Sequence, residues 1–100
     1  MHAYSTLPVG IDIEFSSRAV PNFKKLAARF FHSSERPETQ TEFLRLFTKK
    51  EAYTKFLQLP LIKTISTPPP EFVKTYEILP DAIIAIASKD NDTAFMHVLP

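Results

Sequence analysis

Hydrophobic and polar residues alternate along VGIDIEF, residues 9–15, near the start of the chain. A period of two is typical of a β-strand with one buried face, so this stretch predicts a strand. Asp12 and Glu14 would then share one face of the strand, while Ile11 and Ile13 face the core. An otherwise aliphatic strand therefore carries two carboxylates on the same side.

Apolar residues recur at helical spacing in two later segments of the sequence. The first segment begins at Pro21, a favourable first helical residue, and is predicted to end near His32. The second follows the capping-box pattern T-x-x-E of Thr39 and Glu42, and is predicted to continue to about Leu57. A proline three residues further on ends this second helix.

Four more segments are rich in β-branched or aromatic residues and are bounded by turn signals, which predicts strands. They are LIKTIS at 61–66, FVKTYEIL at 72–79, AIIAIAS at 82–88 and TAFMHVL at 93–99. The order of one strand, two helices and several strands predicts an α+β fold, in which an antiparallel sheet packs against two main helices. We expect one domain over residues 1–100.

The amino-acid composition is consistent with a single globular domain and disfavours several classes of protein. The 100 residues include nine Phe and are 44% hydrophobic, which is enough for one domain with a single core. A formal charge of +1 disfavours nucleic-acid binding, which relies on many basic residues. The chain has no cysteine for a disulfide or thiolate site, and its longest apolar run, 82–87, is far shorter than the roughly 20 residues of a membrane span. We expect a soluble, cytoplasmic protein that does not enter a membrane.

The two carboxylates of the first predicted strand are candidates for holding a cation. Side chains at i and i+2 of a strand point the same way about 6.6 Å apart, so Asp12 and Glu14 could converge on one hard cation. The alternative is a solvated acidic face of the strand without a bound ion.

A second candidate cluster is FTKKEAYTK, residues 47–55. Glu51 and Lys55 are four residues apart on one helical face, and Lys50 lies beside them. The alternative is an ordinary surface ion pair worth a few tenths of a kcal/mol. Together, the three acids and two lysines suggest Mg²⁺ with a phosphate-bearing ligand. A glycine-rich phosphate loop is excluded because Gly10 is the only glycine.

Three motifs follow one another along the sequence: GIDIE at 10–14, RFFHSSE at 29–35 and FLRLFTKKEAYTK at 43–55. In order and approximate spacing they resemble the 4'-phosphopantetheinyl transferases, especially the surfactin-synthetase type. The resemblance runs from about Val9 to Leu61. It implies one half of the pseudo-dimer fold of that family.

The resemblance also implies a holo-acyl-carrier-protein synthase activity. Such an enzyme transfers 4'-phosphopantetheine from coenzyme A to a serine of an acyl or peptidyl carrier protein. By this resemblance Asp12, Glu14 and Glu51 would hold the cofactor Mg²⁺ on the pyrophosphate of coenzyme A.

Three further residues receive roles from the same resemblance. Glu35 would be a catalytic base that helps to deprotonate the acceptor serine, and a turn-capping role is its alternative. Lys50 and Lys55 would bind the phosphates of coenzyme A, with Lys55 close enough to the metal to take part in catalysis.

The chain resembles only the second of two similar halves found in the surfactin-synthetase type, which leaves three interpretations. The first is a small transferase whose site forms between identical subunits of a homodimer or homotrimer. The second is a truncated or degenerate half-domain that binds a partner or ligand without turnover. The third is an α+β interaction module whose motifs match by chance.

Overall fold

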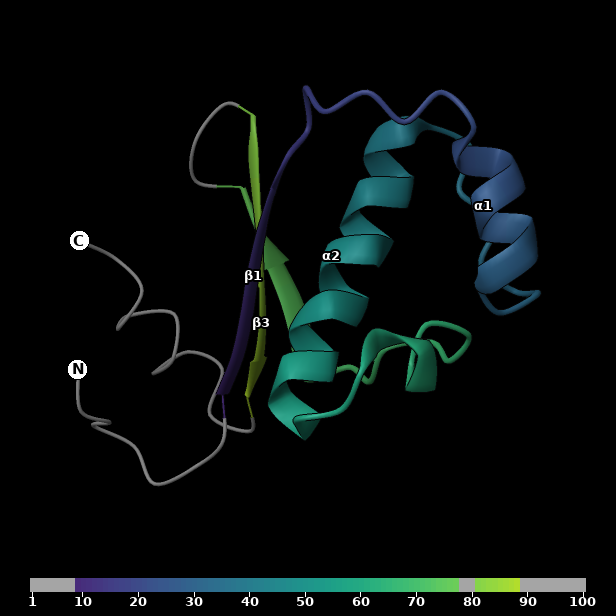
Figure 1. Ribbon diagram of the computed structural model, residues 1–100. Helices are drawn as coiled ribbons and strands as arrows, with labels where there is room; N and C mark the ends of the chain where they lie inside the picture. Colours follow the sequence, from purple (N-terminus) through teal and green to yellow (C-terminus); the bar gives the residue numbers. More distant parts are fainter. Residues whose placement is uncertain (1–8, 78–80, 89–100) are drawn as a thin grey trace.

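A computed structural model of the chain describes residues 9–77 and 81–88. The elements are β1 (Val9–Phe15), α1 (Phe23–Phe30), α2 (Gln40–Leu57), the 3₁₀ helix η1 (Leu61–Lys63), β2 (Val73–Tyr76) and β3 (Ala82–Ser88). The expected α+β class, with an antiparallel sheet and two main helices, is confirmed (Figure 1). No helix among these residues is long and apolar enough to cross a membrane.

The described sheet has the order β1-β3-β2, and both pairings are antiparallel. In the register of the first pair, Asp12 lies opposite Ala85 and Glu14 opposite Ile83. The central strand β3 is buried at every position. Its sequence AIIAIAS is apolar without alternation, which agrees with the burial of side chains on both faces of this strand.

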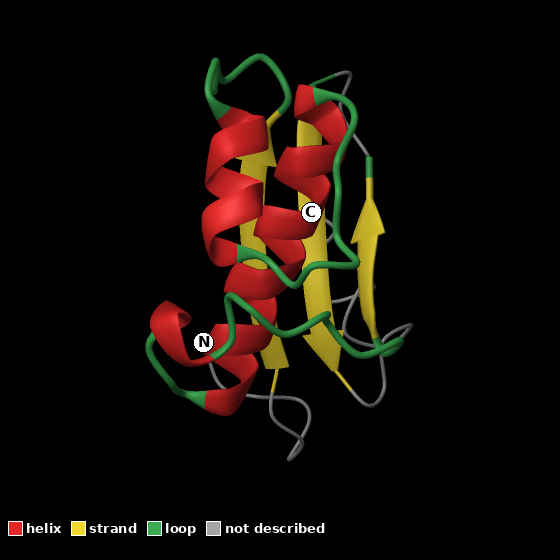
Figure 2. Ribbon diagram, turned by 90° about the vertical axis from the view of Figure 1, so that its right-hand side faces the viewer, coloured by secondary structure: helices red, strands yellow, loops and turns green. Residues whose placement is uncertain are grey.

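Both helices lie on the same face of the sheet (Figure 2). The long helix α2 packs directly on β1 and β3, and α1 lies on the far side of α2 (Figure 1). The main core forms between these layers, where Phe31, Phe43 and Leu44 meet Ile83 of the central strand. The rings of Phe31 and Phe43 stack with their centroids 5.1 Å apart. Aromatic packing thus fixes the end of α1 against α2.

The helix that carries the candidate site, α2, begins and ends by identifiable local interactions. The Thr39 hydroxyl accepts a hydrogen bond from the backbone N–H of Glu42, as the capping pattern predicts. The Glu42 side chain accepts a hydrogen bond from the backbone N–H of Glu38 rather than from that of Thr39. The second hydrogen bond of the capping box therefore goes to the residue before the N-cap. At the other end, Gln58 adopts the left-handed conformation with φ of 57°, which stops the helix before the proline at 60.

Several predicted boundaries differ from the structure. The first helix begins at Phe23, because the preceding residues form a turn. The predicted strand 61–66 is wrong: its backbone bonds locally, with Lys63 N–H donating to Pro60 and Ile65 N–H to Leu61, and forms η1 and turns. The strand predicted for 72–79 is found as the shorter β2. The strand predicted at 93–99 lies outside the described residues.

Candidate functional site

The site lies where α2 crosses β1, and Gly10 allows this contact to be close. A Cβ atom at position 10 would overlap the carbonyl oxygen of Ala52 and the backbone nitrogen of Phe56. The only glycine of the chain therefore stands where helix and strand backbones touch. This contact brings the acidic face of β1 against the charged residues of α2.

The side of β1 that faces α2 is the acidic one. Alternation along the strand places Asp12 and Glu14 on the same side as Gly10, toward the helix. We expected both isoleucines to face the core, and this expectation is wrong for Ile13. Ile13 is 51% exposed, and Ile11 belongs to a separate, smaller apolar cluster. The carboxylates thus occupy a covered face, where their charge matters more than on a solvated one.

Two cations contact these carboxylates. The ammonium of Lys55 lies 2.9 Å from Asp12 Oδ1 and also donates to the carbonyl of Ile11 at 3.2 Å. The Lys55 side chain is 53% exposed, whereas that of Asp12 is only 12% exposed. Arg18 pairs with Glu14 at 2.6 Å. The helix–strand junction therefore combines acids held inward with cations that reach water.

The pKa of Glu51 on α2 is affected by the same charged residues. Burial raises the pKa of the Glu51 carboxyl, and the charge of Asp12 raises it further. Lys55 lowers this pKa, Glu14 raises it and Arg18 lowers it. The three acids predicted from the sequence thus share one electrostatic environment, in which the ionised form of Glu51 is disfavoured.

The donor set of this junction fits a divalent cation. The second oxygen of Asp12, Oδ2, is buried and has no hydrogen-bond partner among the described residues. A buried, unpaired carboxylate oxygen beside two further acids is a favourable ligand for a hard cation. Over residues 9–77 and 81–88, however, no three such side chains converge as a ready metal cluster. Lys55 and Arg18 hold two of the carboxylates instead.

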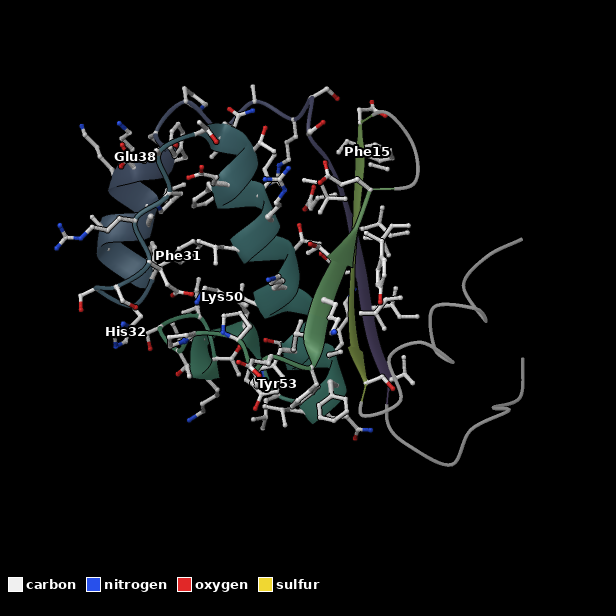
Figure 3. All side chains as sticks on the ribbon, turned by 180° about the vertical axis from the view of Figure 1, so that it is seen from behind. Phe15, Phe31, His32, Glu38, Lys50 and Tyr53 are labelled. Carbon is white, nitrogen blue, oxygen red and sulfur yellow. The ribbon has the colours of Figure 1, made fainter. Side chains whose placement is uncertain are left out.

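Lys50 lies one residue before Glu51, but it points to a different side of the helix. Its ammonium is 2.7 Å from Glu35 Oε1, and the two side chains are only 1% and 7% exposed. It also donates to the carbonyl of Thr67 at 2.9 Å and lies 4.7 Å from the centre of the Phe31 ring. Figure 3 shows Lys50 directed toward the Phe31 and His32 side of α2. Lys50 therefore belongs to a second, buried charge pair.

Burial and charge act in opposite directions on Lys50. Burial lowers the pKa of its ammonium group, while the hydrogen bond and the charge of Glu35 raise it. The net pKa direction is downward. Lys50 is thus held in place by its partners despite an environment that disfavours its charge.

The Glu35 carboxylate is held through one oxygen only. Its Oε1 accepts from Lys50 and from the backbone N–H of His32 at 3.0 Å. Its Oε2 is buried and has no hydrogen-bond partner within the described part of the chain. The turn-capping role that we considered for Glu35 is therefore present, and it leaves the second oxygen available as an acceptor.

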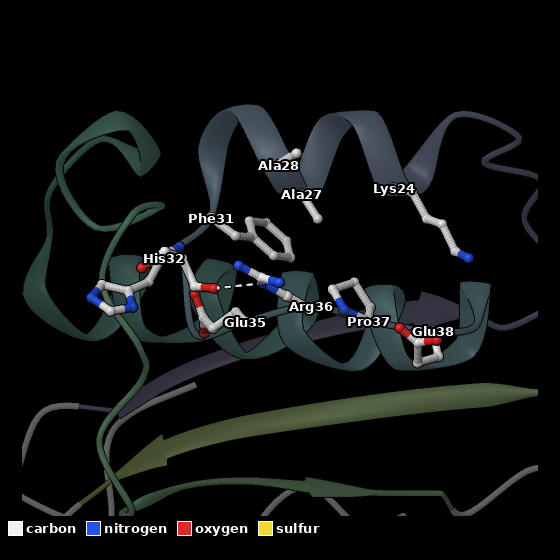
Figure 4. Close-up of a pocket in the computed structure, with 10 residues that line it drawn as sticks. Lys24, Ala27, Ala28, Phe31, His32, Glu35, Arg36, Pro37 and Glu38 are labelled. Carbon is white, nitrogen blue, oxygen red and sulfur yellow. Dashed lines mark hydrogen bonds between the residues drawn. The ribbon is translucent and has the colours of Figure 1, made fainter.

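A cavity of about 390 Å³ lies beside this pair, between α1 and the segment 31–38 (Figure 4). Glu35 forms part of its wall together with Phe31 and Pro37. Basic side chains of Lys24 and Arg36 also line it. Open volume thus reaches the Glu35 side chain from the α1 side of the molecule.

The structure groups the six predicted site residues into two clusters. Asp12, Glu14, Glu51 and Lys55 lie at the α2–β1 junction, and Glu35 and Lys50 form the buried pair. The partners Thr67 and Phe31 of Lys50 were not predicted from the sequence. A backbone carbonyl such as that of Thr67 leaves no side-chain signal, and a phenylalanine in a helical pattern reads as core.

Comparison with known proteins places the chain in a family. The family model of the 4'-phosphopantetheinyl transferase superfamily matches residues 8–96, and the chain belongs to this superfamily. The described fold agrees with one half of the fold of these transferases. The match extends beyond the region at 9–61 that carries the sequence motifs. No curated protein and no solved structure matches the chain significantly.

Proposed function

We propose that this chain transfers 4'-phosphopantetheine from coenzyme A to a serine of an acyl or peptidyl carrier protein in the cytoplasm. Superfamily membership supports this class of reaction. The observation that carries the proposal is the junction of α2 with β1, where the buried, unpaired Asp12 Oδ2 shares its surroundings with Glu51 and Lys55. Acids and a lysine in one place suit a metal-bound pyrophosphate.

Asp12, Glu14 and Glu51 are the residues that would hold Mg²⁺. When bound, the ion would neutralise charge on the pyrophosphate of coenzyme A. Lys55 has its ammonium at the same junction and a half-exposed, flexible side chain, so it can turn from Asp12 to a phosphate. This exchange needs no change in the backbone of α2.

Glu35 is the proposed base. It would accept the proton of the serine hydroxyl through water, because the Glu35 pair is buried and lies on another side of α2 from the proposed metal ligands. The serine oxygen then bonds to the phosphorus that carries the pantetheine, and the pyrophosphate P–O bond breaks to release adenosine 3',5'-bisphosphate. The unpaired Oε2 of Glu35 supports this role, because a base needs a lone pair that no protein donor occupies.

We also propose that the chain acts as a homodimer or homotrimer, with a site completed by a neighbouring subunit. One half of a two-half fold encloses only part of a ligand of this size, whereas small ligands are normally buried over most of their surface. The exposed apolar side chains of Ile13 and Phe15 on β1 support an interface there. A strictly monomeric sedimentation profile at high concentration, in a preparation that is active, would contradict the shared site.

A non-catalytic half-domain is the second candidate function. One observation favours it: Lys55 and Arg18 already neutralise two of the acids within the chain, as in a stable protein without metal. Such a domain would bind a partner or coenzyme A without turnover.

One assay separates these two functions. The protein is incubated with coenzyme A, Mg²⁺ and several apo carrier proteins, and each carrier is examined by mass spectrometry for added phosphopantetheine. Addition to a serine supports the transferase. Calorimetric titration of Mg²⁺ in the presence of coenzyme A then tests the metal ligands, since Asp12→Ala should weaken binding. Equal affinity in wild type and Asp12→Ala contradicts this metal site.

A further inference from the structure

The ammonium group of Lys50 has three contacts inside the protein, two of them hydrogen bonds and the third a cation–π contact. They are with the carboxylate of Glu35, the carbonyl of Thr67 and the face of the Phe31 ring. The side chain is 1% exposed, so an incoming phosphate could reach it only if these contacts broke. This arrangement differs from that of Lys55, which is half exposed and holds a carboxylate at the open junction. Lys50 is built to hold a protein group.

The group that Lys50 holds is one particular oxygen. Oε1 of Glu35 accepts one hydrogen bond from the Lys50 ammonium and another from the backbone N–H of His32. Two donors, one of them charged, restrain the position of this oxygen. They also leave Oε2 without a donor, although this atom is buried. An acceptor without a donor in such surroundings is costly for the fold, and its lone pairs stay free of protein donors.

We propose that Lys50 is a positioning residue for the transfer reaction: it fixes Oε1 of Glu35 so that Oε2 receives the serine proton. This inference rests on the proposed transferase function. It removes Lys50 from the contacts to coenzyme A and leaves Lys55 to bind the phosphate. Lys50 also joins three segments that are distant in sequence, because Glu35, α2 and Thr67 meet at its ammonium.

The first test measures kinetics of the full chain with coenzyme A, Mg²⁺ and an apo carrier protein. For Lys50→Met we expect kcat per folded molecule to fall about 100-fold, the lower range for a lost general base, with KM for coenzyme A changed less than about threefold. Lys49→Met, on the neighbouring position of α2, is the matched control and is expected to keep wild-type kcat. A Lys50→Met enzyme with raised KM and unchanged kcat would show a phosphate contact and overturn the proposal. Unchanged kcat and KM would overturn it as well.

A second comparison remains informative even if Lys50→Met folds poorly. The double variant Glu35→Gln/Lys50→Met removes both charges of the buried pair, which is tolerated better than removing one. If Lys50 acts only through Glu35, this double variant should have the same kcat as Glu35→Gln. A further fall of about tenfold or more would mean that Lys50 acts independently of Glu35, contrary to the proposal.

The third readout does not depend on turnover. The N–H of His32 donates to the carboxylate oxygen that Lys50 holds, so its NMR signal reports the position of that carboxylate. Lys50→Met should shift this signal and speed exchange of the His32 amide about tenfold, while Lys49→Met should leave it in place. An inactive wild type would end the transferase proposal, and the His32 signal would then still show whether Lys50 holds the Glu35 carboxylate in place. An unmoved signal in Lys50→Met overturns the positioning role in either case.

Discussion

Helix α2 carries two lysine–acid pairs of similar geometry in different surroundings. Lys55 and Asp12 meet at 2.9 Å where the helix crosses β1, and the lysine side chain is half exposed. Lys50 and Glu35 meet at 2.7 Å on another side of the helix, and both are buried. A helical step of about 100° per residue sends Lys50 and Glu51 to different faces although they are neighbours in sequence. Similar chemical pairs can therefore serve different purposes within a few residues.

Charge balance distinguishes the two regions more clearly than distance does. At the β1 junction the acids Asp12, Glu14 and Glu51 share the cations Lys55 and Arg18, so negative charge is in excess. At the buried pair, one acid faces one cation. An excess of carboxylate suits a site that receives a divalent cation, whereas a balanced pair suits a fixed element of the fold. This contrast can be tested in four ways, beginning with the largest expected effect.

The largest effect is expected at the buried pair. Lys50→Met leaves the Glu35 carboxylate buried without its cation and should lower the free energy of unfolding by about 3–5 kcal/mol. That loss is a large share of the roughly 5–15 kcal/mol typical of a domain. Urea unfolding at neutral pH measures it.

The control for this prediction is Glu35→Gln/Lys50→Met, which removes both charges. It should recover most of the stability, since a neutral pair carries no buried unpaired charge. A loss below about 1 kcal/mol for Lys50→Met alone would mean that the pair is solvated in solution, and the contrast between the two regions would disappear.

Lys55→Ala should have the opposite profile, with a small effect on stability and a large one on ligand binding. An exposed ion pair contributes at most about 1 kcal/mol to folding. A charge-assisted contact to a phosphate is worth roughly 1.5–3 kcal/mol, so affinity for coenzyme A with Mg²⁺ should fall about ten- to over a hundredfold. Calorimetry measures the affinity, with the exposed Lys63→Ala as control. Wild-type affinity in Lys55→Ala would show that Lys55 is an ordinary surface residue of the helix with no role in binding.

Gly10→Ala tests whether the junction requires close contact between backbones. The added methyl group would overlap the backbone of α2 at Ala52 and Phe56. Forcing the helix outward should cost about 1–3 kcal/mol and weaken Mg²⁺ binding, because Asp12 and Glu51 then separate. Val9→Ala, at an exposed position of the same strand, should change stability by less than about 0.5 kcal/mol. Equal unfolding midpoints for the two variants would contradict the role of Gly10.

The fold was largely predictable because its main elements have strong local signals. Alternation identified β1, and the Thr39 cap identified the start of α2. The strand predicted at 61–66 failed because a short stretch rich in β-branched residues is also compatible with turns, and here local hydrogen bonds form η1. Alternation also does not say which side of a strand a helix covers. Gly10 carried that information, since a residue without a side chain marks where two backbones meet.

The sequence suggested six candidate site residues, but it did not predict that the structure divides them into two regions. The i, i+4 spacing places Glu51 and Lys55 on one face, and this helical face is where the structure has them. Burial of Lys50 could not be predicted from its sequence context, because lysine in a helix with other lysines is typical of a solvated face. Its partner Thr67 acts through a backbone carbonyl, which any residue type supplies.

The smallest expected effect concerns the pH dependence of stability at Glu51. Its folded-state pKa is raised, so the folded protein favours the protonated form, and the stability that this confers is lost as pH rises through the folded pKa. Glu51→Gln mimics the protonated form and should be more stable than wild type at neutral pH, by less than about 1 kcal/mol after solvent screening. The stabilities of the two proteins should converge below the ordinary carboxyl pKa.

Urea unfolding from pH 4 to 8 in EDTA measures this difference in stability. Saturating Mg²⁺ should reverse the sign of the difference at neutral pH, because the ion stabilises only the wild type. A stability difference that depends on neither pH nor Mg²⁺ would show that Glu51 is not coupled to the acids of β1. The electrostatic contrast between the two regions of α2 would then be lost.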